Sequence, residues 1–221
     1  MIDLVAFDLD GTLVDSHRDL AAAANGLVTG LGGTPLTDEQ VVRMVGEGAA
    51  VLVRRALTAS GLDPDTPGAL DRFLAIYDGC LLDRTLPYPG TEDTLARLKP
   101  HHRLAVLTNK PGRATQRILD GLALTHYFDA IVGGDSPFGH KPDPSGLLHI
   151  ISTCGTSADK TVLVGDSPVD RETARRAGAT ICLARFGFGF TFRDGDLDGS
   201  EIVLEKPLDV VTAVQTLDCR L

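Results

Sequence analysis

VAFDLDGTLVDS, residues 5–16, joins the end of an apolar run to a series of carboxylates at a glycine. Residues 4–7 are all apolar, which is typical of a parallel strand covered on both faces. Asp8 and Asp10 should therefore emerge at the carboxyl end of this strand, and Gly11 indicates that the backbone turns there. Two carboxylates so close together repel each other, and they require a cation, a raised pKa or full solvation.

The same residues also fit a purely structural interpretation. They could form a polar turn at the end of a strand, with Asp15 and Ser16 capping the following helix. The rest of the sequence has to distinguish this structural interpretation from a functional site.

Composition and charge exclude several classes of protein. The chain has 221 residues, 43% of them hydrophobic, a net charge of −9 and a pI near 5.0, which argues against binding to nucleic acid. No apolar run approaches the ~20 residues of a membrane span, and residues 1–3 lack the basic start of a signal peptide. We expect a cytoplasmic protein without a membrane partner, monomeric or homodimeric, whose four widely spaced cysteines are reduced.

Residues 16–84 have the pattern of a helical region. Helical spacing of apolar residues predicts helices over residues 16–31, from Thr37, over 49–60 and around 70–81. Pro87, Pro89 and Gly90 then suggest a stiff, hinge-like connection. We therefore predict a small all-helical domain, residues 16–84, inserted into a core made of residues 1–15 and 85–221.

The remainder of the chain alternates between helix and strand patterns. Expected helices cover residues 91–99, 112–122, 144–153 and 169–177; expected strands cover 103–107, 130–133, 161–164 and 180–184, followed by an edge strand at 201–204 and a last helix from 207. This rhythm predicts an α/β fold with a doubly wound, Rossmann-like parallel sheet. In such sheets ligands bind outside the carboxyl ends of the strands.

Polar residues follow several expected strands. Residues 108–111 read TNKP, residues 165–170 read GDSPVD, and a loop between them, residues 140–144, reads HKPDP. Individually, residues 108–111 could be a turn, residues 140–144 a solvated loop and residues 165–170 a helix cap. Together they meet at one edge of the predicted sheet, which favours a catalytic site.

The motifs resemble those of the haloacid dehalogenase superfamily of phosphohydrolases. DLDGTLV, residues 8–14, resembles its first motif, Thr108 its second and Lys141 its third, and Asp166 with Asp170 resembles its fourth. The resemblance implies that Asp8 is a nucleophile that forms an aspartyl-phosphate, and that Asp10 is the general acid and base.

The resemblance also implies ligands for a metal and for phosphate. Mg²⁺ would be held by the Asp8 carboxylate, the Asp10 carbonyl and Asp166, with Asp170 behind them or acting through water. The residues expected to bind the phosphoryl group are Thr12, Thr108, Asn109 and Lys141.

The helical insertion resembles the cap domain of this superfamily, which closes over the site. Residues 45–57, Asp135, Ser136 and residues 141–144 are similar to those of phosphoglycolate phosphatases, so we expect a small phosphorylated acid as substrate. Arg43, Arg54 and Arg55 are interpreted mainly as a solvated helix face. Residues 187–190, GFGF, are interpreted as a packed, mobile loop to which we assign no chemistry.

Several alternatives remain open at this level. The same motifs fit a sugar-phosphate phosphatase, a β-phosphoglucomutase-like mutase or a pyrophosphatase. A dehalogenase proper is disfavoured because Asp10 supplies an acid that such enzymes lack. A non-enzymatic phospho-acceptor module is also conceivable, although a base at Asp10 would shorten the life of the phosphorylated aspartate.

Overall fold

A parallel six-stranded sheet lies at the centre of the structure, a computed structural model that describes residues 1–193 and 195–219. Each pair of neighbouring strands runs parallel. In spatial order the strands are β5 (Ala130–Val132), β4 (Arg103–Leu107), β1 (Leu4–Phe7), β6 (Thr161–Gly165), β7 (Thr180–Ala184) and β8 (Ile202–Leu204). The predicted α/β class and parallel sheet are therefore confirmed.

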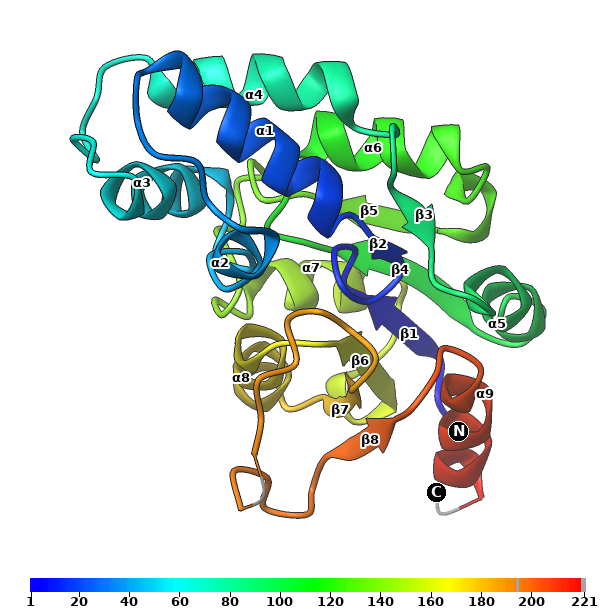
Figure 1. The fold of residues 1–221 in the computed structure, drawn as a ribbon. Coiled ribbons are helices and arrows are strands. Elements are labelled where there is room, and N and C mark those ends of the chain that lie inside the picture. The colour runs from blue at the N-terminus through cyan, green and yellow to red at the C-terminus, as the bar shows by residue number, and fades with distance from the viewer. Residues whose placement is uncertain (194, 220–221) are drawn as a thin grey trace.

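Helices cover both faces of this sheet (Figure 1). One face carries α5 (Thr91–Leu98), α6 (Gly112–Gly121) and α9 (Asp209–Asp218); the other carries α7 (Ser145–Thr153) and α8 (Pro168–Ala177). In β1, Val5 and Phe7 belong to the first hydrophobic cluster, and Leu4 and Ala6 to the second. Burial on both sides explains why this strand is a continuous apolar run rather than an alternating pattern.

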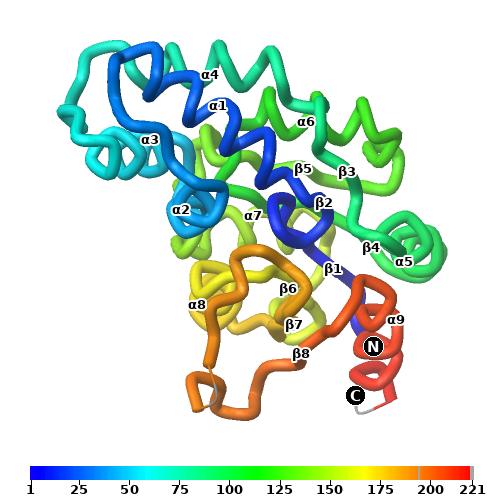
Figure 2. Tube along the Cα trace, in the orientation of Figure 1, coloured from blue at the N-terminus to red at the C-terminus, as the bar shows by residue number. Residues whose placement is uncertain are grey.

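Two short helical turns and a contact between the first residues and the last helix complete the core. The 3₁₀ turns are η1 (Thr125–Tyr127) and η2 (Ala158–Lys160). The backbone N–H of Ile2 donates to Asp218 Oδ1 at 2.5 Å, so the start of the chain lies against the last helix, as the trace in Figure 2 also shows. No helix in the described part of the chain is long and apolar enough to span a bilayer.

Four helices lie within residues 16–84, as the periodicity predicts. They are α1 (His17–Gly30), α2 (Asp38–Val42), α3 (Ala49–Ala59) and α4 (Ala69–Cys80). Thr37 and Gln40 form a capping box at the start of α2. In Figure 1 these blue to cyan helices lie beyond the carboxyl end of β1, so the insertion faces the edge of the sheet where the polar motifs end.

The two chain segments that join insertion and core lie side by side. β2 (Val14–Asp15) pairs antiparallel with β3 (Leu86–Pro87). The buried carboxylate of Asp19 in α1 accepts hydrogen bonds from Arg84 N, Thr85 N and Thr85 Oγ1 at 3.0, 2.8 and 2.7 Å. This paired ribbon was not predicted, because two-residue strands are too short to produce a periodicity.

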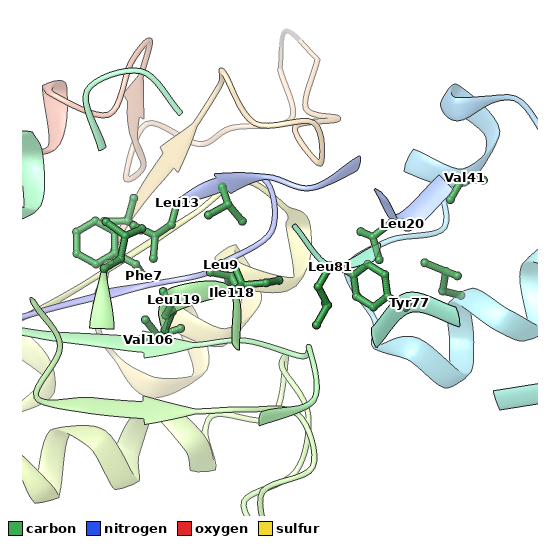
Figure 3. Close-up of a cluster of buried hydrophobic side chains, with 14 of the residues drawn as sticks. Phe7, Leu9, Leu13, Leu20, Val41, Tyr77, Leu81, Val106, Ile118 and Leu119 are labelled. Carbon is green, nitrogen blue, oxygen red and sulfur yellow. The ribbon is translucent and has the colours of Figure 1, made fainter. Parts of the chain in front are cut away.

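Hydrophobic packing is continuous from the sheet into the insertion (Figure 3). The buried cluster includes Phe7 of β1 and Ile118 of α6 on the core side. On the insertion side it also includes Leu20 of α1, Tyr77 of α4 and Leu81, which is the C-cap residue of α4. The insertion is therefore held against the core by apolar contacts as well as by the β2–β3 ribbon.

Candidate active site

The carboxyl ends of three adjacent strands bring the motifs together. β1 lies between β4 and β6, so Asp8, which follows β1, has Thr108 on one side and Asp166 on the other. Between β1 and β6 the direction in which successive strands are added reverses, and in open α/β sheets ligands bind at this point. The three residues therefore lie at one edge of the sheet, as predicted from the strand ends.

Asp8, Asp166 and Asp170 form a buried cluster of carboxylates. One oxygen of each lies within 4.8 Å of the others, and their exposed fractions are 7%, 2% and 0%. Burial is the main cause that raises the pKa of Asp8 to about 6, with Asp170 adding to the effect and Lys141 opposing it. Burial and the charges of Asp170 and Asp8 also raise the pKa of Asp166 well above its usual range.

Lys141 lies behind this cluster. Its Nζ is 2.8 Å from Asp8 Oδ1 and 2.6 Å from Asp170 Oδ1. The other Asp170 oxygen accepts from Ser167 Oγ at 2.6 Å, within the capping box that starts α8. Burial would lower the pKa of Lys141, but the charges of Asp170 and Asp8 outweigh it and raise the pKa. Lys141 therefore remains a cation.

Three glycines enclose Asp166. Gly189 N donates to Asp166 Oδ2 at 2.7 Å. A Cβ atom on Gly11, whose φ is +86°, would lie 1.8 Å from the same oxygen, and one on Gly187 would lie 2.5 Å from it. The loop of residues 187–190, to which the sequence analysis assigned no chemistry, is thus part of the site.

Asp10 is held by a lysine that the sequence analysis did not assign to the site. Lys110 Nζ lies 3.0 and 2.9 Å from the two Asp10 oxygens, and Ser16 Oγ donates to Oδ1 at 2.5 Å. Lys110 is 6% exposed; burial opposes its charge, but Asp10 and Tyr77 raise its pKa. Four clustered carboxylates require more than one compensating cation, and this excess of acid is the one feature of the sequence that could have suggested a second lysine.

The side chain of Asn109 links three segments around the site. Its Nδ2 donates to Gly46 O and to Lys141 O, both at 2.9 Å, and its Oδ1 accepts from Lys141 N at 2.7 Å. The side-chain amide therefore ties the loop after β4 to the Lys141 loop and to the insertion. Its backbone N–H, like those of Leu9 and Asp10, has no acceptor among the residues described here, and such groups can stabilise a developing oxyanion.

A cavity of about 310 Å³ opens over these groups. Its floor includes Asp8, Asp10, Thr108 and Asp166, and its remaining wall comes largely from the insertion. The insertion residues that line it are Leu20, Val42, Arg43, Val45, Gly46, Glu47, Gly48, Ala49, Leu52, Arg55, Phe73, Leu74 and Tyr77. Arg43 and Arg55 thus border the cavity, whereas Arg54 pairs with Asp65 on the surface.

Thr12 is not brought into this cavity. Its buried hydroxyl faces a separate small pocket with Leu13 and Thr91 and has no hydrogen-bond partner among the described residues. Thr108 does line the main cavity, and its Oγ1 accepts from Lys110 N at 3.2 Å, which leaves its hydroxyl hydrogen free to donate. Of the two threonines that the sequence predicts to bind phosphate, the structure therefore places only Thr108 at the main cavity.

The arrangement fits a divalent cation. Asp8 Oδ1 is buried, and among the described residues only the Lys141 ammonium, at 2.8 Å, is placed to donate to it. With all groups ionised, the four carboxylates against the two lysines leave a formal charge of −2. Hard oxygen donors of this kind are the ligands that Mg²⁺ prefers.

Comparison with known proteins gives a consistent result. The model of the family described as haloacid dehalogenase-like hydrolase matches residues 5–184. A phosphoglycolate phosphatase of Pseudomonas fluorescens (strain Pf0-1) is 38% identical, over 97% of this chain and 78% of that protein. Phosphoglycolate phosphatase 1 of Pseudomonas aeruginosa is 41% identical with the same coverage of 97% and 78%. A crystal structure from Haemophilus somnus, described as a predicted phosphoglycolate phosphatase, has a TM-score of 0.88 at 28% identity, covering 97% and 98% of the two chains.

Proposed function

Because the chain belongs to the haloacid dehalogenase-like hydrolase family and is a phosphoric monoester hydrolase, we propose that it is a Mg²⁺-dependent phosphatase acting on a small phosphorylated acid such as 2-phosphoglycolate. The observation that carries this proposal is the Asp8 carboxylate at the end of β1. It is buried beside Lys141, within 4.8 Å of Asp166 and Asp170, and it opens into the cavity.

Asp8 is the nucleophile in this proposal. Its carboxylate attacks phosphorus, the leaving alcohol departs, and an aspartyl-phosphate remains, so one difficult hydrolysis becomes two easier steps. Asp10 gives a proton to the departing oxygen and later takes one from the attacking water. Lys110 and Ser16 orient the Asp10 carboxylate for both steps.

Fixed donors around Asp8 bind the phosphoryl oxygens. Thr108 supplies a free hydroxyl hydrogen, and the backbone N–H groups of Leu9, Asp10 and Asn109 supply dipoles that need no reorganisation during the reaction. Lys141 contributes positive charge from behind Asp8. Asp8, Asp166 and the Asp10 carbonyl would hold Mg²⁺, with Asp170 behind them, and the ion would neutralise charge on the transferred phosphoryl group.

The helical insertion acts as a cap over this site. The domain division inferred from the sequence, a cap of residues 16–84 and a core of residues 1–15 and 85–221, is part of this proposal. Two polar contacts support it, since Asn109 donates to Gly46 and Lys110 donates to Tyr77 across the boundary. A cap in this position excludes water from the aspartyl-phosphate until Asp10 is positioned to take a proton from the attacking water molecule.

The lining of the cavity supports a small acid over a sugar, because Arg43 and Arg55 border it and can offset the charge of a carboxylate. Val42, Val45, Leu52, Phe73 and Leu74 give its cap side an apolar wall. A hexose would bury several hydroxyl groups against this wall without partners, at a cost of about 1–3 kcal/mol each. The names of the curated relatives support the same substrate class.

A substrate panel tests the proposal. We expect Mg²⁺-dependent release of phosphate, with a higher kcat/KM for 2-phosphoglycolate than for glucose 6-phosphate, β-glucose 1-phosphate or pyrophosphate. Acid quenching during turnover should trap phosphate on the protein, and Asp8→Asn should abolish both signals, whereas Asp71→Asn, an exposed carboxylate of α4, should change neither. Equal activity on the hexose phosphates, or migration of phosphate on glucose, would instead favour a sugar phosphatase or a mutase.

A further inference from the structure

Tyr77 and Lys110 meet where the insertion contacts the core. Tyr77 lies in α4, and Lys110 lies in the loop after β4. Lys110 Nζ is 2.6 Å from the Tyr77 hydroxyl oxygen and also contacts both oxygens of Asp10. Tyr77 is 3% exposed and Lys110 6%, yet both line the cavity that also contains Asp8.

The direction of these hydrogen bonds follows from the chemistry of the ammonium group. A lysine ammonium carries three donors and no acceptor. Its contacts with Asp10 Oδ1, Asp10 Oδ2 and Tyr77 account for all three, so the Tyr77 oxygen must accept. The hydroxyl hydrogen of Tyr77 is therefore left to donate elsewhere, and none of the residues that the structure describes accepts it.

A buried hydroxyl hydrogen without an acceptor is unfavourable, and the open side of Tyr77 is the cavity. Burial raises the pKa of Tyr77, so the hydroxyl stays protonated and remains a donor. Donation from Lys110 to its oxygen polarises the O–H bond and strengthens it as a donor. The ring is fixed by stacking on Phe73, with centroids 5.8 Å apart.

We propose that Tyr77 is a specificity-determining residue whose hydroxyl donates a hydrogen bond to a carboxylate on the leaving alcohol of the substrate. This inference rests on the proposed function. Tyr77 shares Lys110 with Asp10, the residue that protonates the leaving oxygen, so its hydroxyl lies on the side where the alcohol departs. A charged acceptor gains most from such a donor, which selects a leaving group that carries an acid.

The experiment compares two substrates that differ in this acid. Kinetics are measured for 2-phosphoglycolate and for ethyl phosphate, which has the same number of carbon atoms but no carboxylate. The variants are Tyr77→Phe, which removes only the hydroxyl, and Tyr127→Phe, the same change at a half-buried tyrosine outside the cavity. For each protein, the kcat/KM for 2-phosphoglycolate is divided by the kcat/KM for ethyl phosphate. This ratio is then compared between the parent protein and each variant, so the different intrinsic reactivity of the two esters cancels.

We expect Tyr77→Phe to lower the preference for 2-phosphoglycolate over ethyl phosphate by about 10- to 100-fold, the value of a hydrogen bond to a charged group. Tyr127→Phe should leave the preference unchanged, and both variants should unfold at temperatures close to that of the parent protein. If Tyr77→Phe slowed both substrates equally, Tyr77 would serve only to hold Lys110 and Asp10, and the inference would be wrong.

Failure of the inference and failure of the proposed function give different results. A parent enzyme that prefers 2-phosphoglycolate, together with a Tyr77→Phe variant that keeps the preference, would overturn the inference alone. A parent enzyme that hydrolyses both esters equally well would overturn the proposed substrate class and the inference with it.

Discussion

Lowering the pH from 7 to 5 should weaken Mg²⁺ binding by about tenfold through Asp8 alone. A metal ion binds the ionised carboxylate, so a proton on Asp8 competes with it. The pKa of Asp8 in the metal-free protein is raised to about 6, chiefly by burial. The ionised fraction of such a group falls from about 0.9 at pH 7 to about 0.1 at pH 5, which corresponds to about 1.4 kcal/mol of binding free energy.

The raised pKa of Asp8 also determines how the stability of the metal-free protein changes with pH. Because the folded pKa of Asp8 lies above its ordinary value of 3.8, the metal-free protein loses stability as the pH rises from about 4 through 6. Bound Mg²⁺ removes this penalty, so its stabilising effect should grow over the same range. Asp166, whose pKa is also raised, acts in the same direction.

The assay is a Mg²⁺ titration at pH 5, 6, 7 and 8, followed by calorimetry and by thermal unfolding. Calorimetry in buffers of different ionisation enthalpy reports the protons released on binding, with release expected at pH 5 and little at pH 8. Asp8→Asn should remove the part of the pH dependence due to Asp8, and Asp71→Asn should preserve it. Equal Mg²⁺ affinity at pH 5 and pH 7 would refute the reasoning that Asp8 is both buried and a ligand.

Three further predictions concern Asp10, Cys182 and Asp19. Asp10→Asn should slow hydrolysis of ethyl phosphate by at least about 100-fold, while nitrophenyl phosphate should still give a rapid burst of phenolate; equal slowing of both would contradict an acid role. Burial raises the pKa of the Cys182 thiol to about 12, so the folded protein keeps a proton that the unfolded chain loses above about pH 9. Stability should therefore fall by about 1.4 kcal/mol per pH unit from this group, and guanidinium unfolding of Cys182→Ala should lack that contribution. Asp19→Ala leaves three donors unpaired and should lower the free energy of unfolding by about 3 kcal/mol, against little change for the exposed Asp83→Ala.

Most of the fold follows from local patterns in the sequence. The strands at residues 4–7 and 161–165 are apolar runs because they are buried on both faces, and the helices of the insertion show a 3.6-residue period because one face is buried. The β2–β3 ribbon is different. It depends on residues 14–15 meeting residues 86–87, a contact that no local pattern encodes.

The site was predictable to the extent that it consists of strand ends. Asp8, Thr108 and Asp166 follow from the topology of a parallel sheet. Lys110 was missed because its role depends on Asp10, one hundred residues away. Asn109 was expected to bind phosphate, and the sequence could not show which of its groups is available: its side chain is used for Gly46 and Lys141, since buried amide groups need partners of their own.

The distribution of charge indicates where the proposed Mg²⁺ would bind. Lys141 pairs with Asp8 and Asp170, and Lys110 pairs with Asp10, so each lysine is committed to particular carboxylates. Asp166, in contrast, has no cationic partner within ion-pairing distance in the described part of the chain, only the N–H of Gly189. Its raised pKa follows from burial beside Asp170 and Asp8. A carboxylate enclosed by glycines and beside two like charges is stable in its ionised form only with a cation next to it, and the Asp8 carboxylate lies close enough to share that cation.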